Sequence, residues 1–548
     1  RRVHGDACFA MMGFNSFIMF FIILFIVSSF TPSTAASDNT TADSVVQCLL
    51  NGGNSDIASA IYTPSSSSFT SVLNEYIRNL RYETPSTRKP LFILTALRVS
   101  HVQAAVLCAK RYGLEMKIRS GGHDYEGISY WSVSPFFILD MFKLNNVDVD
   151  PKTATAWVQT GATLGEVYYY AANKTDNKYG FPAGVCPTVG VGGHFGGGGY
   201  GNMMRKYGLS VDNIIDATMV DVKGRILNRK AMGEDLFWAI TGGGGQSFGV
   251  VLSYRITLVP VPATVTVFSV SRTLEENAAE IVNKWQYVAP FIDDDLFIRM
   301  TLGSKTVSKK VTGNAKFIAL YLGNATSLLA IMKKKFPELG LNQTDCIETT
   351  WVDSVVFWTN FDRGTPATAL LSRVPQVLTH LKRKSDYVKT QLPKEGIDAL
   401  FQTLISVKPV SLTFNPYGGK MAEIPVAAKP FPHRAGVLWK LQYACNWDED
   451  GDTASEFYLN LTNTLHTFMT PYVSSNPREA FFNYRDLDIG INFNGADSFA
   501  QGSSYGIPYF KGNFKRLVNI KSRADPCNFF RNEQSIPVLP TVRKKGKC

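Results

Sequence analysis

GVCPTVGVGGHFGGGGYGNMMRKY, residues 184–207, is the stretch that decides the fold of this chain. It sets one cysteine, Cys186, and one histidine, His194, in a dense run of glycines. Glycine is selected where the main chain must approach a ligand closely or adopt positive φ. Successive main-chain N–H groups in such a loop form an anion-binding concavity that suits a diphosphate. The stretch therefore predicts a loop that packs against a bound cofactor.

A second glycine turn, RSGGHDYEG at residues 119–127, carries His123. One glycine loop is weak evidence, but Gly-Gly-His followed by Cys-Pro-Thr-Val-Gly-Val-Gly-Gly-His is long and ordered. The alternative is a pair of ordinary glycine turns with a buried histidine and a small apolar cysteine. Neither stretch has the dinucleotide fingerprint G-x-G-x-x-G with an acidic residue further on. A diphosphate would therefore be held by loops between two subdomains.

Both stretches resemble the berberine bridge enzyme-like flavoproteins of plants, in the vanillyl-alcohol oxidase superfamily. NYRDLDIG at 483–490 and YFKGNFKRLVNIKSRADPCNFFRNEQSIP at 509–537 also look like this family. The resemblance implies an α+β protein with a two-subdomain FAD-binding domain of the vanillyl-alcohol oxidase (PCMH) type. It also implies an α+β substrate domain with a large antiparallel sheet. FAD is expected to be bound covalently, through its 8α carbon to His123 and through C6 to Cys186.

The length of 548 residues is too great for one ordinary core, so several domains are expected. The resemblance implies four parts of the chain: a leader with a signal peptide at 1–36, an FAD-binding domain at 86–260, a substrate-binding domain at 261–478, and a C-terminal segment at 479–540 that returns to the FAD domain.

Hydrophobic patterns predict the main elements of both domains. In the FAD-binding part, a strand, a helix opened by a capping box at 100–103 and a second strand predict a βαβ unit. A hairpin is predicted around Lys223-Gly224, and a helix followed by a glycine loop over 236–251. The remaining strands are predicted at 90–96, 116–118, 136–141, 154–159, 264–270, 316–321 and 437–447, and the helices at 163–172, 277–288 and 327–335.

The resemblance also implies the catalytic residues. Tyr484 matches the tyrosine that faces the reacting side of the flavin, and it is the candidate base. Gln442 stands where alkaloid-oxidising members carry a glutamate base, and an amide cannot take a proton. Lys440, two residues earlier on the same strand, points to the same face and would lower the pKa of a nearby tyrosine. Tyr200 and Tyr125 match two pocket tyrosines of alcohol-oxidising relatives.

Further residues are implied as cofactor contacts. His194 resembles the histidine that hydrogen-bonds near the ribityl chain, and Val189 stands where a larger residue blocks oxygen in some relatives. Family members commonly carry arginine where this chain has Thr241, so one polar contact is in doubt. The other implied contacts are Arg119, Ser120, Gly121, Gly122, Asp124, Thr188, Gly190, Gly192, Gly193, Gly249, Tyr509 and Asn513.

These residues predict a flavoprotein oxidase. A primary alcohol or the anomeric hydroxyl of a sugar would give a hydride to flavin N5, and O2 would leave as H2O2. The alternatives are an alkaloid or phenolic oxidase, which Gln442 disfavours, and a flavin-binding protein with little turnover. The expected partners are a small molecule or oligosaccharide and O2. Nucleic acid is not expected, because basic residues do not cluster among aromatics. We expect a monomer without a metal site.

Secretion is predicted from the leader. Its apolar run at 17–27 is too short to span a bilayer and is followed by small residues, so a signal peptide cut near Ala36 is expected. A signal anchor is the alternative; otherwise no stable membrane insertion is expected. Residues 1–10 precede the first methionine, and an upstream translation artefact is one interpretation of them. The predicted destination is the apoplast or cell wall, with the vacuole or another secretory compartment as alternatives.

A net charge of +11 would attract an acidic matrix such as pectin, although simple solubility explains it equally well. Candidate glycan sites for a secreted chain occur at Asn39, Asn173, Asn324, Asn342 and Asn460.

Seven cysteines follow the leader, and an odd number in an oxidising compartment requires one with another role. Cys186, bound to flavin, would supply it. The resemblance implies a disulfide between Cys48 and Cys108. The pairing of the other four, Cys346, Cys445, Cys527 and Cys548, stays open.

Overall fold

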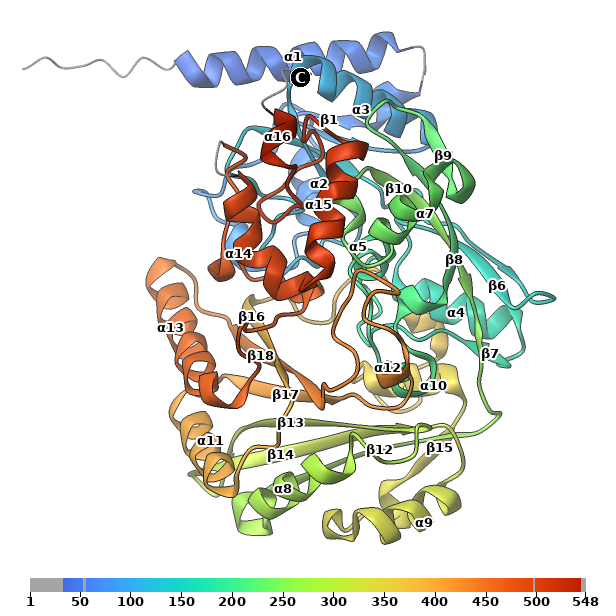
Figure 1. The fold of residues 1–548 in the computed structure, drawn as a ribbon, viewed down its shortest axis with the longest axis vertical. Helices are drawn as coiled ribbons and strands as arrows, with labels where there is room; N and C mark the ends of the chain where they lie inside the picture. Colours follow the sequence, from blue (N-terminus) through green and yellow to red (C-terminus); the bar gives the residue numbers. More distant parts are fainter. Residues whose placement is uncertain (1–32, 53–55, 496–497, 544–548) are drawn as a thin grey trace, which may run out of the picture.

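The structure is a computed structural model that describes residues 33–52, 56–495 and 498–543 (Figure 1). Most of the predicted leader, and Cys548, therefore lie outside the described residues. A large antiparallel sheet forms the lower half of the molecule in Figure 1, and two smaller sheets with their helices form the upper half. The predicted α+β class with a large antiparallel sheet is confirmed.

The first small sheet has the strand order β1-β2-β4-β3. The helix α3 (Val99–Tyr112) connects β2 to β3, and β4 lies between these two strands and is parallel to both. The predicted βαβ unit is present, but no side chain caps the start of α3 at Arg98, so the predicted capping box is wrong. The strands are β1 (Ile61–Tyr62), β2 (Ile93–Thr95), β3 (Glu115–Arg119) and β4 (Phe136–Asp140).

The second small sheet is antiparallel, with the order β5-β6-β10-β8-β9. The predicted hairpin is β8 and β9. The predicted helix followed by a glycine loop over 236–251 is present: α7 (Arg229–Ile240) ends before Gly242 and Gly244, which adopt positive φ. The helix begins earlier than predicted, at Arg229. The strands are β5 (Val147–Asp150), β6 (Thr155–Gln159), β8 (Ile214–Val220), β9 (Ile226–Asn228) and β10 (Val250–Thr257).

The large sheet has seven strands in the order β15-β12-β14-β13-β17-β18-β16, with every neighbouring pair antiparallel. Its outer face is covered by α8 (Ala278–Val288), α9 (Ala325–Lys335), α11 (Lys394–Ser406) and α13 (Asp452–Phe468) (Figure 1). The strands are β12 (Val265–Thr273), β13 (Leu296–Val307), β14 (Lys310–Tyr321), β15 (Ile347–Thr349), β16 (His380–Val388), β17 (Ser411–Pro416) and β18 (Trp439–Trp447).

Alternation along β18 decides which side chains face the FAD-binding half. Leu441, Tyr443 and Cys445 pack into the core under the helices. Because successive side chains on a strand point to opposite faces, Lys440 and Gln442 face the other way, as predicted. The C-terminal helices α14 (Ser498–Phe510) and α15 (Asn513–Ala524) return to the upper half, where α15 packs against α7 (Figure 1).

The predicted disulfide is present and joins Cys48 of α1 (Ser33–Asn51) to Cys108 of α3. Cys527 is also disulfide-bonded. Cys186, Cys346 and Cys445 are free thiols, so the odd number of cysteines does not by itself single out Cys186.

The surface agrees with a glycosylated chain, since all five candidate glycan asparagines are exposed.

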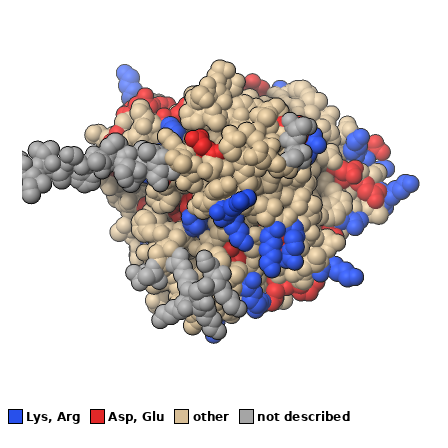
Figure 2. Space-filling model, turned by 90° about the horizontal axis from the view of Figure 1, so that it is seen from above, with Lys and Arg blue, Asp and Glu red and all other residues tan. Residues whose placement is uncertain are grey.

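On the face over α1 and the C-terminal segment, basic and acidic side chains lie next to one another around the edge, with a smaller basic group nearer the middle (Figure 2). None of the helices in the described part of the chain is both long and apolar enough to cross a bilayer.

A buried ionic cluster fastens three distant parts of the chain together. Lys382 on β16 donates to Glu126 at 2.5 Å and to Asp486 at 2.7 Å. Lys384 donates to the other oxygen of Asp486 at 2.8 Å and to Asp488 at 2.5 Å. Glu126 follows the His123 turn and Asp486 follows Tyr484, so the cluster fixes both beside the large sheet.

Lys382→Met is expected to lower the free energy of unfolding by about 3–5 kcal/mol, because two buried carboxylates lose a shared cation. Lys284→Met is the control: its pair with Glu338 at 3.3 Å is solvated and contributes about 1 kcal/mol or less. Urea denaturation measures both. Equal losses in the two variants would contradict the structural role of the cluster.

Candidate functional site

A cavity of about 450 Å³ lies between the two glycine turns and the inner face of the large sheet. The turns contribute residues 120–125 and much of 184–194 to its wall. The sheet contributes side chains from β13, β16 and β18, and the segment 481–485 closes one side. A volume of this size is typical of a cofactor or ligand pocket.

The two glycine turns meet through their main chains. A Cβ on Gly121 would lie 2.4 Å from the nitrogen of Gly190, and one on Gly190 would lie 2.2 Å from Oγ of Ser120. Only glycine permits this approach at either position. At Gly193 a Cβ would meet no protein atom, and this residue lines the cavity. The wall here is bare main chain, which leaves room for a flat ring system.

His123 and Cys186 converge on this cavity, and Thr188 lies between them. The Thr188 hydroxyl is 2.9 Å from Nε2 of His123 and 3.5 Å from Sγ of Cys186. Burial, and then the charge of Arg78, lower the pKa of His123 to about 3, so its imidazole is neutral. A neutral imidazole keeps a nucleophilic nitrogen, as attachment to a flavin requires.

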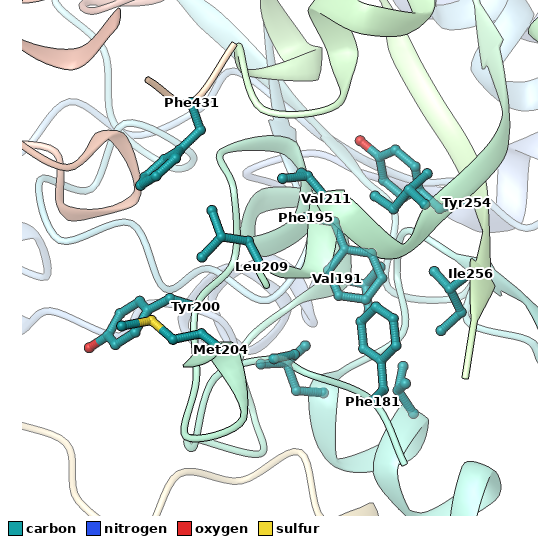
Figure 3. Packing of buried hydrophobic residues seen from close by; sticks show 14 of the residues in the cluster. Phe181, Val191, Phe195, Tyr200, Met204, Leu209, Val211, Tyr254, Ile256 and Phe431 are labelled. Carbon is teal, nitrogen blue, oxygen red and sulfur yellow. The ribbon is translucent and has the colours of Figure 1, made fainter. Parts of the chain in front are cut away.

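An apolar core supports the glycine loop from behind (Figure 3). Phe195, from the short helix α5 (Val191–Gly196), lies between Phe181 at 5.2 Å and Tyr254 at 5.8 Å, measured between ring centroids. Tyr200 leaves this core with its hydroxyl directed away from the other labelled side chains (Figure 3). The loop therefore fixes Tyr200 at the cavity wall.

The catalytic candidates lie close together in the cavity. The Tyr200 and Tyr484 hydroxyls are hydrogen-bonded to each other, and the ring centroids of Tyr125 and Tyr484 are 5.5 Å apart. Gln442 donates from Nε2 to the Tyr125 hydroxyl at 3.2 Å. The sequence motifs that carry these residues are separated by hundreds of positions, and the structure brings them to one surface.

Lys440 lies behind the tyrosines rather than in the cavity wall. Its Nζ is 3.0 Å from the Tyr200 ring centroid and 4.2 Å from that of Tyr484, and it makes no hydrogen bond within the described residues. Burial, and then Arg299, lower the pKa of Lys440 well below its ordinary value. Burial, and then Tyr200, raise the pKa of Tyr484 well above its ordinary value. The predicted lowering of the tyrosine pKa by Lys440 is therefore wrong in this state.

His194 lines the cavity and accepts a hydrogen bond at Nε2 from the Gly184 N–H at 3.0 Å. Burial, and then Lys440, lower its pKa to about 3, so the ring is neutral with its proton on Nδ1. Val189 also lines the cavity, near Cys186.

Five of the predicted residues do not line the cavity: Arg119, Thr188, Lys440, Tyr509 and Asn513. Arg119 is fully buried and forms an ion pair with Asp140 at 2.5 Å. Its charge is therefore paired within the protein and stabilises the subdomain. Tyr509 donates to Gln534 at 3.0 Å. The Asn513 amide anchors the carbonyls of Val426, Lys429 and Pro430. For Arg119, Tyr509 and Asn513, the predicted direct contact with a cofactor is not supported.

Thr241 is also remote from the cavity wall. It is fully buried, and its hydroxyl donates to the Phe237 carbonyl of its own helix at 3.0 Å. Lys429 approaches Thr241 at 3.4 Å, and burial lowers the pKa of Lys429 to about 8.

Several cavity residues were missed by sequence reasoning, among them Arg78, Arg299 and Arg383. They come from a segment before the first motif and from strands β13 and β16, and no local pattern distinguishes them from surface arginines. Arg383 shares the inner face with Gln442 because the β16–β18 register pairs it with Ala444, and that register is known only from the structure.

The residues present fit an FAD. The cavity combines a main-chain wall for the flat ring with His123 and Cys186 beside it. Arg78 also lines the cavity and suits a diphosphate, whereas Lys117 and Arg531 are already paired with Glu533 and Glu115. His123 and Cys186 would hold the ring, and the 190–194 main chain would lie against it.

Two family profiles match the chain. The FAD binding domain family matches residues 90–229, and the family described as berberine and berberine like matches residues 480–537. These two ranges contain His123, Cys186 and Tyr484.

Individual relatives match over nearly the whole length. Berberine bridge enzyme-like 8 from Arabidopsis thaliana is 55% identical over 529 residues, which are 95% of this chain and 99% of the relative. The solved structure of wild-type Phl p 4.0202, described as a glucose dehydrogenase, is 43% identical with a TM-score of 0.86, over 90% of this chain and 99% of that one. An isoleucine-to-valine variant of the same allergen is described as a glucose oxidase. A berberine bridge enzyme variant is 34% identical with a TM-score of 0.85, over 90% and 100% of the two chains.

Proposed function

The chain belongs to the berberine bridge enzyme-like family of FAD-dependent oxidoreductases, and we propose that it is an oxidase of an alcohol or a carbohydrate hydroxyl with FAD bound to both His123 and Cys186. The observation that carries this proposal is the convergence of both side chains on one cavity, which the hydrogen-bonded pair Tyr200 and Tyr484 also lines. FAD supplies a hydride acceptor at N5 and passes two electrons to O2, which leaves as H2O2.

The protein residues supply position and proton transfer. Tyr484 is the group that takes the proton of the substrate hydroxyl, since its own hydroxyl lies at the cavity wall and is hydrogen-bonded to Tyr200. Because burial, and then Tyr200, raise the pKa of Tyr484, only the deprotonated fraction of Tyr484 could accept this proton at neutral pH. Gln442 and Tyr125 orient the substrate through neutral hydrogen bonds. His194 would donate from Nδ1 toward the ring edge where negative charge develops on reduction.

The amide of Gln442 favours a hydroxyl over an amine or phenol. An amide orients a hydroxyl but cannot take a proton from an alkaloid or phenol. A glucose-oxidising relative with the same fold supports a carbohydrate substrate.

We propose the domain bounds and the location that the sequence predicts. The FAD-binding domain covers residues 86–260 and the segment 479–540, and the substrate domain covers 261–478. The chain is secreted to the apoplast or cell wall, which the Cys48–Cys108 disulfide and the exposed candidate glycan asparagines support, and it is a monomer.

The function is tested by measuring H2O2 formed from a panel of sugars, primary alcohols and benzylisoquinolines in air. Sugars or alcohols are expected to yield peroxide in step with oxidised product. Peroxide from the alkaloids alone would move the chain to the alkaloid-oxidising type, and no peroxide from any compound would favour a flavin-binding role.

Val189→Leu is expected to slow reoxidation of the reduced protein by O2, because the larger side chain crowds the cavity wall beside Cys186. In Phl p 4, an isoleucine-to-valine change accompanies the step from glucose dehydrogenase to glucose oxidase. Stopped-flow measurement of the two half-reactions separates reoxidation from reduction by substrate. Equal slowing of both would make Val189 a packing residue rather than an oxygen gate.

A further inference from the structure

The side chains of His123 and Cys186 share one hydrogen-bond partner. The Thr188 hydroxyl is 2.9 Å from Nε2 of His123 and 3.5 Å from Sγ of Cys186. In the part of the chain that the structure describes, Thr188 is the only residue to which either side chain is hydrogen-bonded. Thr188 is 4% exposed and does not line the cavity, so it acts on these two side chains and not on a bound molecule.

A tight turn holds Thr188 in this place. The Val189 N–H donates to the Cys186 carbonyl at 3.3 Å, and Pro187 stands at the second position of the turn, where its fixed φ is favoured. The first two N–H groups of α4 (Leu164–Lys174) donate to the carbonyls of Val189 and Pro187, both at 2.9 Å. These N–H groups have no acceptor inside their own helix, so they are free to anchor the turn. The hydroxyl is therefore carried by a rigid piece of main chain.

The direction of the two hydrogen bonds follows from the Thr188 main chain. A hydroxyl has one proton, so it donates to one of its two partners and accepts from the other. Burial, and then Arg78, lower the pKa of His123, whereas a hydrogen bond to the Thr188 main chain raises it. A main-chain carbonyl only accepts, so the ring nitrogen that faces Thr188 carries the proton. Nε2–H of His123 then donates to the hydroxyl, and the hydroxyl donates to Sγ of Cys186.

This chain of hydrogen bonds prepares both side chains as nucleophiles. With its proton on Nε2, the neutral imidazole of His123 keeps a lone pair on Nδ1. A hydroxyl that donates to sulfur stabilises the thiolate, which is the nucleophilic form of cysteine. One buried hydroxyl thus serves two reactive groups that come from two different glycine turns.

We infer that Thr188 is the positioning residue for covalent attachment of FAD: it fixes the proton of His123 on Nε2 and stabilises the thiolate of Cys186. This inference rests on the two attachments of the proposed function. Each attachment replaces one hydrogen of the side chain and one hydrogen on a carbon of the flavin with a single bond. The two protons and two electrons that leave pass to O2, the acceptor of the proposed oxidase reaction, which becomes H2O2.

Variants of Thr188 separate the hydroxyl from the bulk of the side chain. Thr188→Val keeps the shape and removes the hydroxyl, whereas Thr188→Ser keeps the hydroxyl. Mass spectrometry of peptides from the purified holoprotein measures the ratio of free to flavin-bound His123 and Cys186. Thr188→Val is expected to raise this ratio about 5- to 10-fold at both residues, as loss of one hydrogen bond to each should. Thr188→Ser is expected to keep both ratios close to those of the unmodified protein.

Thr266→Val is the matched control. Thr266 is fully buried on β12, outside the cavity, and its hydroxyl donates to the Gly323 carbonyl at 2.7 Å. Its loss should leave both ratios unchanged. Thr188→Ala, which also lacks the hydroxyl, takes the place of Thr188→Val if that protein does not fold. Unchanged ratios in the folded hydroxyl-free variant, or an equal rise in Thr188→Ser, would overturn the inference. A rise at one residue alone would overturn the shared role.

A thiol measurement keeps this inference separate from the proposed attachments. If acid precipitation releases all of the flavin from the unmodified protein, the attachments are refuted and Cys186 is a free thiol. Its alkylation by iodoacetamide then tests Thr188 directly. Thr188→Val should slow this reaction about 3- to 10-fold, because the thiolate fraction falls by more than the reactivity of each thiolate rises. Thr188→Ser should react at the unmodified rate. An unchanged rate in Thr188→Val would refute the role of Thr188 at Cys186.

Discussion

Tyr484→Phe is expected to lower the rate of flavin reduction by substrate by about 10²–10⁴-fold, the usual contribution of a positioned base. The change removes one hydroxyl and keeps the ring, so the packing against Tyr125 and Phe481 should survive. Because burial raises the pKa of Tyr484, the reduction rate of the unmodified protein should also increase with pH across the neutral range. Anaerobic stopped-flow reduction at several pH values measures both effects.

Tyr509→Phe is the control for this variant. Tyr509 is buried, lies on the same return of the chain and hydrogen-bonds to Gln534, yet it does not line the cavity. Its loss should lower stability and leave the reduction rate within a few-fold. A Tyr484→Phe protein that is reduced at the normal rate would move the base elsewhere, and Tyr200 is then the next residue to change.

The double change His123→Ala and Cys186→Ala is expected to release all of the flavin when the protein is precipitated with acid. Either single change should leave the flavin in the pellet, because one bond remains. The two side chains lie on either side of the Thr188 hydroxyl, so each can reach a different position of one ring system. The measurement is the flavin absorbance of pellet and supernatant.

Cys346→Ala is the matched control, a free thiol outside the cavity. It should change nothing when combined with His123→Ala. Release of the flavin from the Cys186→Ala protein would show that His123 forms no bond to it. Release from the unmodified protein would refute both attachments.

The sequence predicted those parts of the fold that depend on neighbouring residues, such as side-chain alternation along a strand and the start of a helix. Alternation along β18 placed Lys440 and Gln442 on the inner face, and the Thr163–Glu166 pair opens α4 (Leu164–Lys174) where a helix was predicted. The helix and glycine loop predicted over 236–251 are also present, because Gly242 and Gly244 adopt positive φ after α7 ends at Ile240.

The parts that it could not predict depend on burial and on distant partners. The charge state of Lys440 follows from how completely the tyrosine rings enclose its Nζ, which no spacing reveals. Arg119 lies in the glycine turn at 119–127, but its charge is paired with Asp140, twenty-one positions further along the chain. Arg383 lies outside every motif and reaches the cavity because β16 pairs with β18.

The central claim, oxidation of a hydroxyl in this cavity by bound FAD, is tested most directly by anaerobic mixing of the yellow holoprotein with uronic acids, neutral sugars and primary alcohols. At least one of them should bleach the flavin within a single turnover. Admitting air should then restore the colour and form one molecule of H2O2 for each flavin. Dithionite should bleach the flavin in every case and shows that it can be reduced. Reduction by an alkaloid, with none by any sugar, sugar acid or alcohol, would contradict the oxidation of a hydroxyl in this cavity.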